Sequence, residues 1–307
     1  MKLQRLQHKQ TAKYELAIEI QGSWKMIEDS TGDLLYYLQK PIDEIIKDYK
    51  LVAFNESDYN IVLPFRPMAY RDFMLYEKHA IEAARGFVRK YLPKLLPIVK
   101  FYEAITGKTF PKLKPSARYY KYPIFYMGNH LNFIADGESI AIPSYTKELD
   151  YELEIAAILG KPLKNAKPED VSSAIAGFVI LNDFSARDVQ LDEMGSGFGP
   201  MKTKNFGSSI STTVISADEL LSTIDNLSVE VLINDKVITK ANSSNKLFSF
   251  QEAIAYASWE EQLHPGELFA SGTIPTCTGI ENGKMLQSGD TVTFIVDKMG
   301  TLSNKVK

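Results

Sequence analysis

Two glutamates stand two residues apart in segment 149–155, LDYELEI, whose composition predicts a β-strand. Because strand side chains alternate between two faces, Glu152 and Glu154 share one face about 7 Å apart, while the apolar residues between them enter the core. Like charges at that separation repel, so a divalent cation between the two carboxylates is the natural compensation. The alternative is an amphipathic strand with a solvated polar face.

A further acidic residue follows a buried strand. Segment 176–182, AGFVILN, is mostly apolar and ends at Asp183, where a chain leaving the core can direct a carboxylate inward. Arg187 and Gln190 are three residues apart, so one helical turn places them on a shared face, with Ser185 as the cap. A guanidinium beside an amide suits a substrate carboxylate or keto group. The alternative is a local Asp183–Arg187 ion pair.

Asp72 and His79 lie near the start of a long predicted helix. They are seven residues apart, which corresponds to two helical turns if the helix begins early. Asp72 is a candidate metal ligand, and His79 is a candidate general base, because imidazole takes up a proton near neutral pH. The alternative is a histidine with a purely structural role.

Lys204 and Thr273 belong to segments that contain glycine. The glycines of 197–207, GFGPMKTKNFG, allow the backbone to approach a ligand, and Lys204 beside a carboxylate-bound cation would act as an electrophile. The spacing differs from that of a Walker A loop, so phosphate binding is disfavoured. Thr273 follows a predicted strand at a tight turn, and its hydroxyl is a candidate substrate ligand. The alternative is an ordinary β-turn.

Helices and strands must position these residues. The apolar spacing of 79–92 predicts a helix that ends at the following proline, and a second helical segment reaches Thr106. Further helices are predicted to begin near Pro168 and near Ser249, where a glutamate three residues later completes a capping box. Short strands and turns over 14–63 predict a small N-terminal β domain. Longer strands rich in Val, Ile, Phe and Tyr are predicted at 122–128, 138–143, 150–159, 176–183, 228–235 and 290–297.

The composition excludes several classes of protein. The chain has 307 residues, of which 45% are hydrophobic and 24% charged, as in a globular protein. A net charge of −3 argues against nucleic acid or a membrane surface as partner, because phosphate-rich surfaces require a concentrated positive field. We therefore expect a small-molecule partner, with no nucleic acid and no membrane.

Residue counts also bear on redox setting and metal choice. The single cysteine, Cys277, excludes an intramolecular disulfide and fits a reducing, cytoplasmic location. No apolar run is long enough for a signal peptide or a membrane helix. Because 38 carboxylates stand against four histidines, a bound metal is expected to be Mg²⁺, Mn²⁺ or Ca²⁺ rather than zinc.

Four motifs follow one another along the chain: DYELEIA (150–156), NDFSARDVQ (182–190), TKNFGSS (203–209) and HPGELFASGTIP (264–275). In this order they resemble the fumarylacetoacetate hydrolase superfamily, most closely its fumarylacetoacetase and acylpyruvate hydrolase branch. The resemblance implies an α+β fold that is mostly β. It divides the chain into a small N-terminal β domain, 1–64, and a mixed β-roll or sandwich catalytic domain, 65–307. It also implies a homodimer.

The resemblance assigns roles position by position. One divalent cation, Mg²⁺ or Mn²⁺ and alternatively Ca²⁺, is expected on Asp72, Glu152, Glu154 and Asp183. Contacts with the substrate or its developing charge are expected from Lys204, Arg187, Gln190, Tyr126 and Thr273. His79 is expected to activate water, with an acidic partner at either of two positions: Gln287 has the family spacing, and Glu281 is the nearest carboxylate. Met74 stands where fumarylacetoacetases have a tyrosine, which removes a substrate hydrogen bond.

The expected reaction is metal-dependent hydrolysis of a carbon–carbon bond in a β-diketo acid of the acylpyruvate type, through a metal-bound enolate. The same fold and enolate also allow oxaloacetate decarboxylation, dehydration of a 2-keto-3-deoxy sugar acid or isomerisation of a hydroxyhexadienedioate. None of these needs an attacking water, so loss of activity in His79→Ala with metal still bound would indicate hydrolysis. A keto-acid-binding homologue without catalysis is the remaining alternative.

Overall fold

The computed structural model describes all 307 residues and shows an α+β protein in which strands predominate, as predicted. Its largest sheet has thirteen strands, in an order that differs from their order along the chain. The main path runs β4 (Leu51–Val52), β3 (Ser23–Ile27), β2 (Tyr14–Ile20), β1 (Lys2–His8), β15 (Thr213–Ser216), β12 (Ile175–Asn182), β11 (Leu153–Leu159), β18 (Leu268–Ala270), β6 (Tyr70–Phe73) and β7 (Phe125–Gly128). Beside this path lie β5 (Tyr59–Ile61), β8 (Phe133–Ala135) and β14 (Ser208–Ile210).

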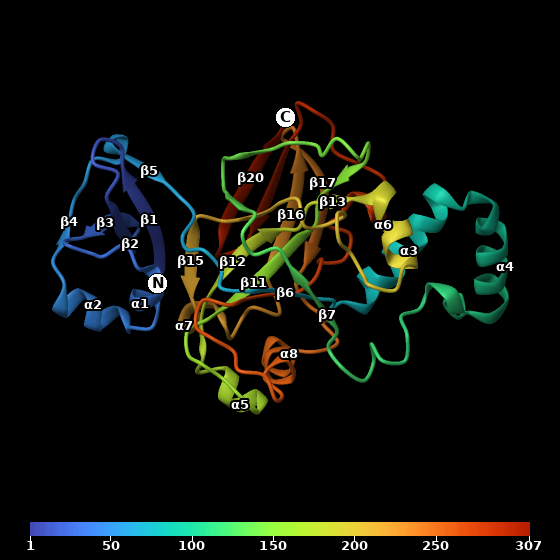
Figure 1. Ribbon diagram of the computed structural model, residues 1–307, viewed down its shortest axis with the longest axis horizontal. Helices are drawn as coiled ribbons and strands as arrows, with labels where there is room; N and C mark the ends of the chain where they lie inside the picture. Colours follow the sequence, from blue (N-terminus) through green and yellow to red (C-terminus); the bar gives the residue numbers. More distant parts are fainter.

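The N-terminal strands form one end of this sheet, together with α1 (Leu34–Leu38) and α2 (Ile42–Asp48) (Figure 1). Antiparallel pairing of β1 with β15 joins them to the rest, with Leu3 opposite Val214. A shared hydrophobic cluster includes Leu3 from this end and Val179 from β12. The boundary predicted at residue 64 follows β5 and remains a prediction, because backbone hydrogen bonds connect the two parts.

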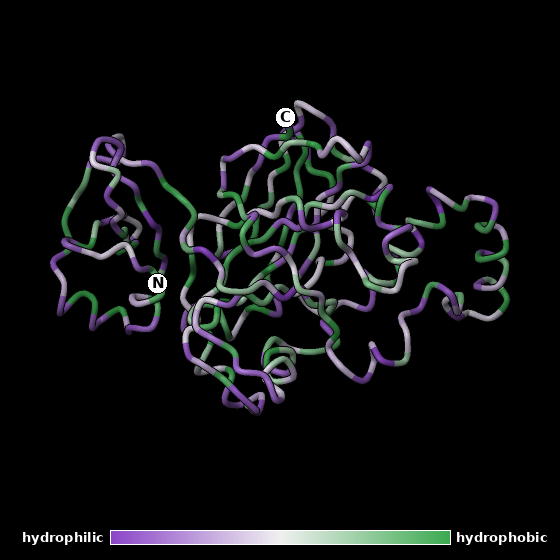
Figure 2. Tube along the Cα trace, in the orientation of Figure 1, coloured by the Kyte–Doolittle hydropathy of each residue, from purple (hydrophilic) through white to green (hydrophobic).

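A second sheet of five strands covers the central strands. It has the order β17 (Lys236–Asn242), β16 (Ser228–Ile233), β19 (Thr291–Val296), β20 (Gly300–Val306) and β9 (Ser139–Ile140). Alternate residues of β19, such as Val292 and Phe294, are buried against the large sheet, as expected for a strand with one solvated face. By contrast, every residue of β11 and β12 is buried, so these two strands lie at the centre of the molecule (Figure 2).

The two longest helices lie at the other end of the molecule from the N-terminal strands (Figure 1). The predicted helix 79–92 is confirmed as α3 (Glu77–Tyr91), and the next as α4 (Leu96–Thr106), closed by left-handed Gly107. The capping box at Ser249 is confirmed at α8 (Phe250–Ala257). The remaining helices are α5 (Pro168–Val171), α6 (Arg187–Gly195), α7 (Ala217–Leu220) and α9 (Gly279–Asn282), with short 3-10 turns η1 (Glu56–Asp58), η2 (Pro93–Leu95) and η3 (Pro111–Leu113). No helix has both the length and the hydrophobicity needed to cross a membrane.

The prediction of only strands and turns over 14–63 was wrong in one part, because this range contains helices α1 and α2. Two predictions near the site residues were also wrong. The single strand predicted over 149–155 is divided: β10 (Leu149–Asp150) pairs with β13 (Ser185–Ala186), and β11 begins only at Leu153. Ser185 therefore belongs to a strand and does not cap α6; its hydroxyl donates to the carbonyl of Asp183 instead. Both differences have one cause, because β10 and β13 form a separate two-stranded sheet that redirects the chain beside the buried strands.

Candidate active site

Three buried carboxylates meet in the part of the large sheet that runs from β12 through β11 and β18 to β6. Asp72 lies on β6, Glu154 on β11 and Asp183 directly after β12. One oxygen from each lies within 4.8 Å of the others. The strand register explains why these acids meet. Asp72 pairs with Ala270 of β18, and Ala270 pairs in turn with Ala156 of β11. Ala156 is two residues from Glu154, so Asp72 and Glu154 lie close together. The sheet thus brings together acids that are far apart in the sequence.

Three oxygens of this acidic triad lack the partners that buried polar atoms normally have. Asp72 Oδ1 and both carboxylate oxygens of Glu154 accept no hydrogen bond. Burial raises the pKa of Asp72 well above its usual range, and the Asp183 carboxylate raises it further. Burial likewise raises the pKa of Glu154, with the two aspartates adding to the effect. A hard divalent cation satisfies such oxygens, so the triad fits the predicted metal in donor chemistry as well as in geometry.

Glu152, the fourth predicted ligand, faces two cations. Its carboxylate pairs with Arg187 and with Lys204. Burial alone would raise its pKa, but Lys204 and Arg187 outweigh burial and hold the pKa of Glu152 well below its usual range. Lys204 Nζ also lies 2.6 Å from Asp183 Oδ2, so this lysine connects Glu152 to the acidic triad. Glu152 therefore lies next to the acidic triad rather than in it, and its role as a metal ligand remains a prediction.

Lys204 is enclosed by acids, as the predicted role of an electrophile requires. It is buried, and burial by itself would lower its pKa. The carboxylates of Asp183 and Glu152 more than offset that effect and raise the pKa of Lys204 above its ordinary value. The side chain therefore keeps its positive charge at neutral pH, which is the form that can stabilise an oxyanion.

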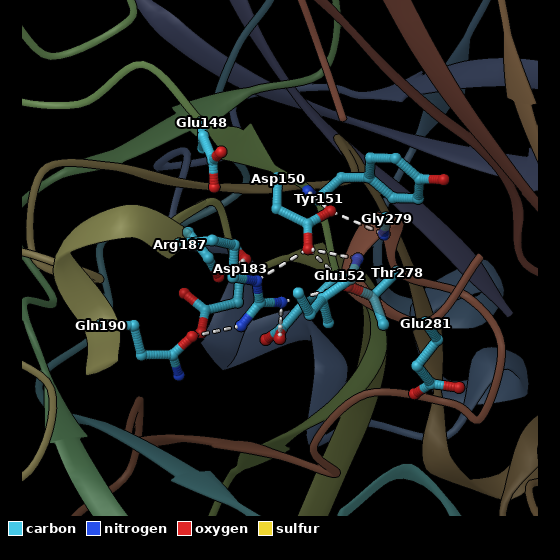
Figure 3. A network of polar contacts seen from close by, with 12 residues as sticks. Glu148, Asp150, Tyr151, Glu152, Asp183, Arg187, Gln190, Thr278, Gly279 and Glu281 are labelled. Atoms are coloured by element: carbon cyan, nitrogen blue, oxygen red, sulfur yellow. Dashed lines mark hydrogen bonds and ion pairs between the residues drawn. The ribbon is translucent and has the colours of Figure 1, made fainter. Parts of the chain in front are cut away.

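The guanidinium of Arg187 organises a buried network (Figure 3). Nε donates to Asp150 Oδ2 at 2.7 Å, Nη1 donates to Gln190 Oε1 at 2.7 Å, and Nη2 donates to Thr278 Oγ1 at 3.0 Å and to Glu152. The predicted shared face of Arg187 and Gln190 is confirmed. The local Asp183–Arg187 ion pair considered as an alternative is not formed, because Asp150 and Glu152 are the acids that Arg187 contacts.

Asp150 is the residue of this network that sequence reasoning missed. It is fully buried and accepts hydrogen bonds from the hydroxyl of Thr278 at 2.8 Å and from the backbone N–H groups of Gly279 at 2.6 Å and Ile280 at 2.9 Å. It therefore holds the first turn of α9 against Arg187. The available signal was the motif DYELE itself, which places a third acid at the same spacing of two residues as the glutamate pair.

His79 and Glu281 form a buried pair. His79 is in the first turns of α3, Glu281 is on α9, and His79 Nδ1 lies 2.5 Å from Glu281 Oε1. The other carboxylate oxygen of Glu281 accepts the backbone N–H of Thr276 at 2.7 Å. Gln287, the alternative partner, is exposed and does not contact the histidine, so the carboxylate is the partner. With Nδ1 engaged, Nε2 is the nitrogen available for proton transfer.

Two predicted substrate contacts complete the site. The Tyr126 hydroxyl donates to Asp183 Oδ2 at 2.8 Å, so this tyrosine also orients a member of the acidic triad. Thr273 is buried in the turn after β18. That turn requires glycine before it: Gly272 has φ +74°, and a Cβ there would lie 2.2 Å from the carbonyl oxygen of Phe73.

The site opens into a single cavity of about 880 Å³. All of the predicted site residues line it except Asp183 and Glu281, which lie behind the side chains they contact. The lining set is Asp72, His79, Tyr126, Glu152, Glu154, Arg187, Gln190, Lys204 and Thr273. Met74 stands where a tyrosine is expected in fumarylacetoacetases, and its side chain, which has no hydroxyl, also lines this cavity. The structure thus gathers into one place residues that the sequence distributes over about two hundred positions.

The fold and site define an α+β protein with a buried acidic centre that opens into a ligand-sized cavity. The chain belongs to the fumarylacetoacetate hydrolase family: the model of the fumarylacetoacetate (FAA) hydrolase C-terminal region matches residues 103–307. Asp72 and His79 precede the matched region, so their membership of the site rests on the structure.

Curated relatives extend the similarity over most of the chain. A mitochondrial oxaloacetate tautomerase of Xenopus laevis is 27% identical over 264 residues, which cover 82% of each protein. The corresponding protein of Rattus norvegicus is 28% identical over 262 residues, covering 81% of this chain and 83% of the relative. An uncharacterised protein of Methanocaldococcus jannaschii is 31% identical over 189 residues, covering 61% of this chain and 74% of the relative.

Solved structures share the fold over the whole chain. The fumarylacetoacetate hydrolase of Exiguobacterium antarcticum superposes with a TM-score of 0.73 at 18% identity, covering 100% of this chain and 99% of that one. A 5-carboxymethyl-2-hydroxymuconate delta-isomerase of Mycobacterium smegmatis gives 0.69 at 16% identity, with the same coverage. At these identities the likeness concerns the fold alone, and it agrees with the predicted fold class.

Proposed function

We propose that this chain is a divalent-cation-dependent enzyme that enolises a 2-keto acid, as a tautomerase or isomerase does. The observation that carries the proposal is a charge imbalance around the acidic triad. Five buried carboxylates, those of Asp72, Asp150, Glu152, Glu154 and Asp183, surround only two buried cations, Arg187 and Lys204. Three negative charges stay uncompensated when all are ionised. Such a centre favours a divalent cation and an oxyanion-forming reaction.

This proposal departs from the hydrolysis expected from the sequence. Relatives of 27% and 28% identity carry the name oxaloacetate tautomerase, and one structural neighbour carries the name of an isomerase. Each of those reactions moves a proton next to a ketone and needs no attacking water. The same site residues could serve both reactions, so the names of the relatives favour enolisation and the geometry is compatible with it.

Asp72, Glu154 and Asp183 would hold the cation, with Glu152 as the proposed fourth ligand and Mg²⁺ or Mn²⁺ as the proposed ion. When bound, a divalent cation supplies Lewis acidity, which makes hydrogens next to a ketone easier to remove.

The side chains around the acidic triad have separate roles in the proposed reaction. Lys204 Nζ, kept protonated by its acidic neighbours, stabilises negative charge on a substrate oxygen. His79 Nε2 takes and returns the proton, because Nδ1 is held by Glu281. Arg187 already contacts four side chains, so we propose that it holds Glu152 and Gln190 in position rather than serving as the main substrate ligand.

Hydrolysis of a β-diketo acid is the second candidate, and the His79–Glu281 pair favours it. A buried histidine oriented by a carboxylate beside an acidic centre suits the activation of water. In that case the same nitrogen would take a proton from water instead of from carbon.

The test is proton NMR in D₂O with Mg²⁺, using oxaloacetate and a series of acylpyruvates, with enzyme-free samples as the control. Enzyme-dependent exchange at C3 without new products supports enolisation. Cleavage to pyruvate and a free acid before any exchange supports hydrolysis instead. Binding without exchange or cleavage would refute both and leave the non-catalytic homologue. Glu154→Gln is the matched inactive variant, since it keeps the shape of the acidic triad while removing a carboxylate.

The expected homodimer and the cytoplasmic location remain predictions. Light scattering on a size-exclusion column tests the first, with a mass of twice 34.5 kDa as the expected result.

A further inference from the structure

The cavity extends well beyond the groups that the proposed chemistry uses. Its volume of about 880 Å³ lies toward the upper end of the ~300–1,000 Å³ range of pockets that enclose drug-sized ligands. Oxaloacetate has only four carbons and needs a small part of that space. The charged side chains gather at one end, around the acidic triad, so the rest of the cavity must serve some other part of a ligand.

One wall of this remaining space is a continuous face of α3. Beginning at His79, the residues that line the cavity are Ala80, Ala83, Ala84, Phe87 and Val88. They recur at helical spacing, so they share one side of the helix. At a rise of about 1.5 Å per residue, Val88 lies roughly 13 Å along the helix axis from His79. The alanines leave room close to the histidine, and the larger side chains follow farther away.

The facing walls are apolar as well. Leu113 of η3 and Ile124 and Phe125 near the start of β7 lie on one side. Leu191 and Met194 of α6 lie on another.

Lys112 is the one charged residue that lines the cavity away from the charged end, and it is exposed. An exposed cation contributes little to the binding of an anion, because water screens the charge. The outer cavity therefore offers a partly buried apolar surface for hydrocarbon, with Leu191 and Met194 exposed at its rim, and no buried partner for a second carboxylate.

We infer that the α3 face and the walls opposite it form a subsite for an apolar tail. The preferred substrate is then a 2-keto acid with a long alkyl or aryl substituent, not a short dicarboxylate. This inference rests on the proposed function for the position of the keto-acid head at the acidic triad, and it adds the chemical class of the substrate.

Binding and turnover of a matched series test the subsite separately from the reaction. Calorimetric titration with 2-ketobutyrate, 2-ketohexanoate, 2-ketooctanoate, phenylpyruvate and oxaloacetate, in Mg²⁺, measures affinity whether or not the chain enolises them. We expect Kd to fall about fourfold for each methylene added, hence roughly sixteenfold from 2-ketohexanoate to 2-ketooctanoate. C3 exchange in D₂O, measured on the same compounds, should rank them in the same order by kcat/KM.

Ala84→Leu fills the subsite, and Ala104→Leu makes the same change on the exposed part of α4, outside the cavity. We expect Ala84→Leu to reduce the preference for 2-ketooctanoate over oxaloacetate at least tenfold, and Ala104→Leu to leave it unchanged. Affinity that is independent of tail length, tighter binding of oxaloacetate, or no binding of 2-ketooctanoate would each overturn the inference. Tail-dependent binding without exchange would support the subsite and count against enolisation.

Discussion

Removing divalent cations should make the stability of the folded chain depend on pH in an unusual direction. Burial and mutual repulsion raise the folded-state pKa values of Asp72 and Glu154 well above the usual range. Between the ordinary carboxyl pKa of roughly 4 and the raised folded value, the folded chain binds more protons than the unfolded chain. Its stability therefore falls as pH rises through that window.

The size of the effect follows from the geometry. The two carboxylates lie in one cluster and titrate as a coupled pair, so we count one extra proton. One proton corresponds to about 1.4 kcal/mol of unfolding free energy per pH unit. For a chain of 307 residues that is roughly 2 °C in Tm per pH unit. A cation present at one hundred times its Kd would raise the unfolding free energy by about 2.7 kcal/mol.

The cation should also reverse the direction of the pH dependence, because it binds the ionised carboxylates and competes with protons. Differential scanning calorimetry from pH 5.5 to 8.0, with EDTA and with excess Mg²⁺, measures both slopes. Glu154→Gln should abolish the stabilisation by Mg²⁺, whereas Glu230→Gln, at a surface ion pair with Lys240, should retain it. A metal-free chain whose stability rises with pH across this range would refute the argument that the acidic triad holds extra protons.

Three further predictions concern the groups around the acidic triad. Asp150→Asn removes a buried countercharge of Arg187 and should lower the unfolding free energy in urea by about 3–5 kcal/mol; a variant as stable as the parent would show that the pair is not structural. Gly86→Ala places a methyl group 2.1 Å from the carbonyl oxygen of Ile280, so α3 must shift and urea unfolding should show a loss of about 1–3 kcal/mol; an unchanged midpoint contradicts this packing. Glu281→Gln should reduce the rate of C3 exchange roughly 10- to 100-fold with Mg²⁺ affinity unchanged in calorimetry, and an unaltered rate would exclude the pair from catalysis.

Local sequence patterns were sufficient for several features of the site. A run of apolar residues that ends at Asp183 predicts a buried strand with a carboxylate at its end, and the structure has that strand as β12. Helical spacing predicted α3, the helix that carries His79. These predictions succeed because backbone periodicity and chain-breaking residues act over short distances.

Contacts between distant segments could not be predicted in this way. The division of 149–155 into β10 and β11 depends on β13, which lies more than thirty positions further along the chain. That division turns Asp150 and Glu152 toward Arg187 and leaves Glu154 with the acidic triad. The choice of Glu281 over Gln287 depends in the same way on where α9 packs against α3.

The sequence by itself determined which chemical groups this protein has and which local elements carry them: carboxylates at strand ends, a histidine early in a helix, and a lysine in a glycine-containing loop. Only the tertiary structure decided which of these groups meet. Strand register and helix packing join residues across the whole chain, and whether a carboxylate pairs with a cation or remains available for a metal depends on those long-range contacts.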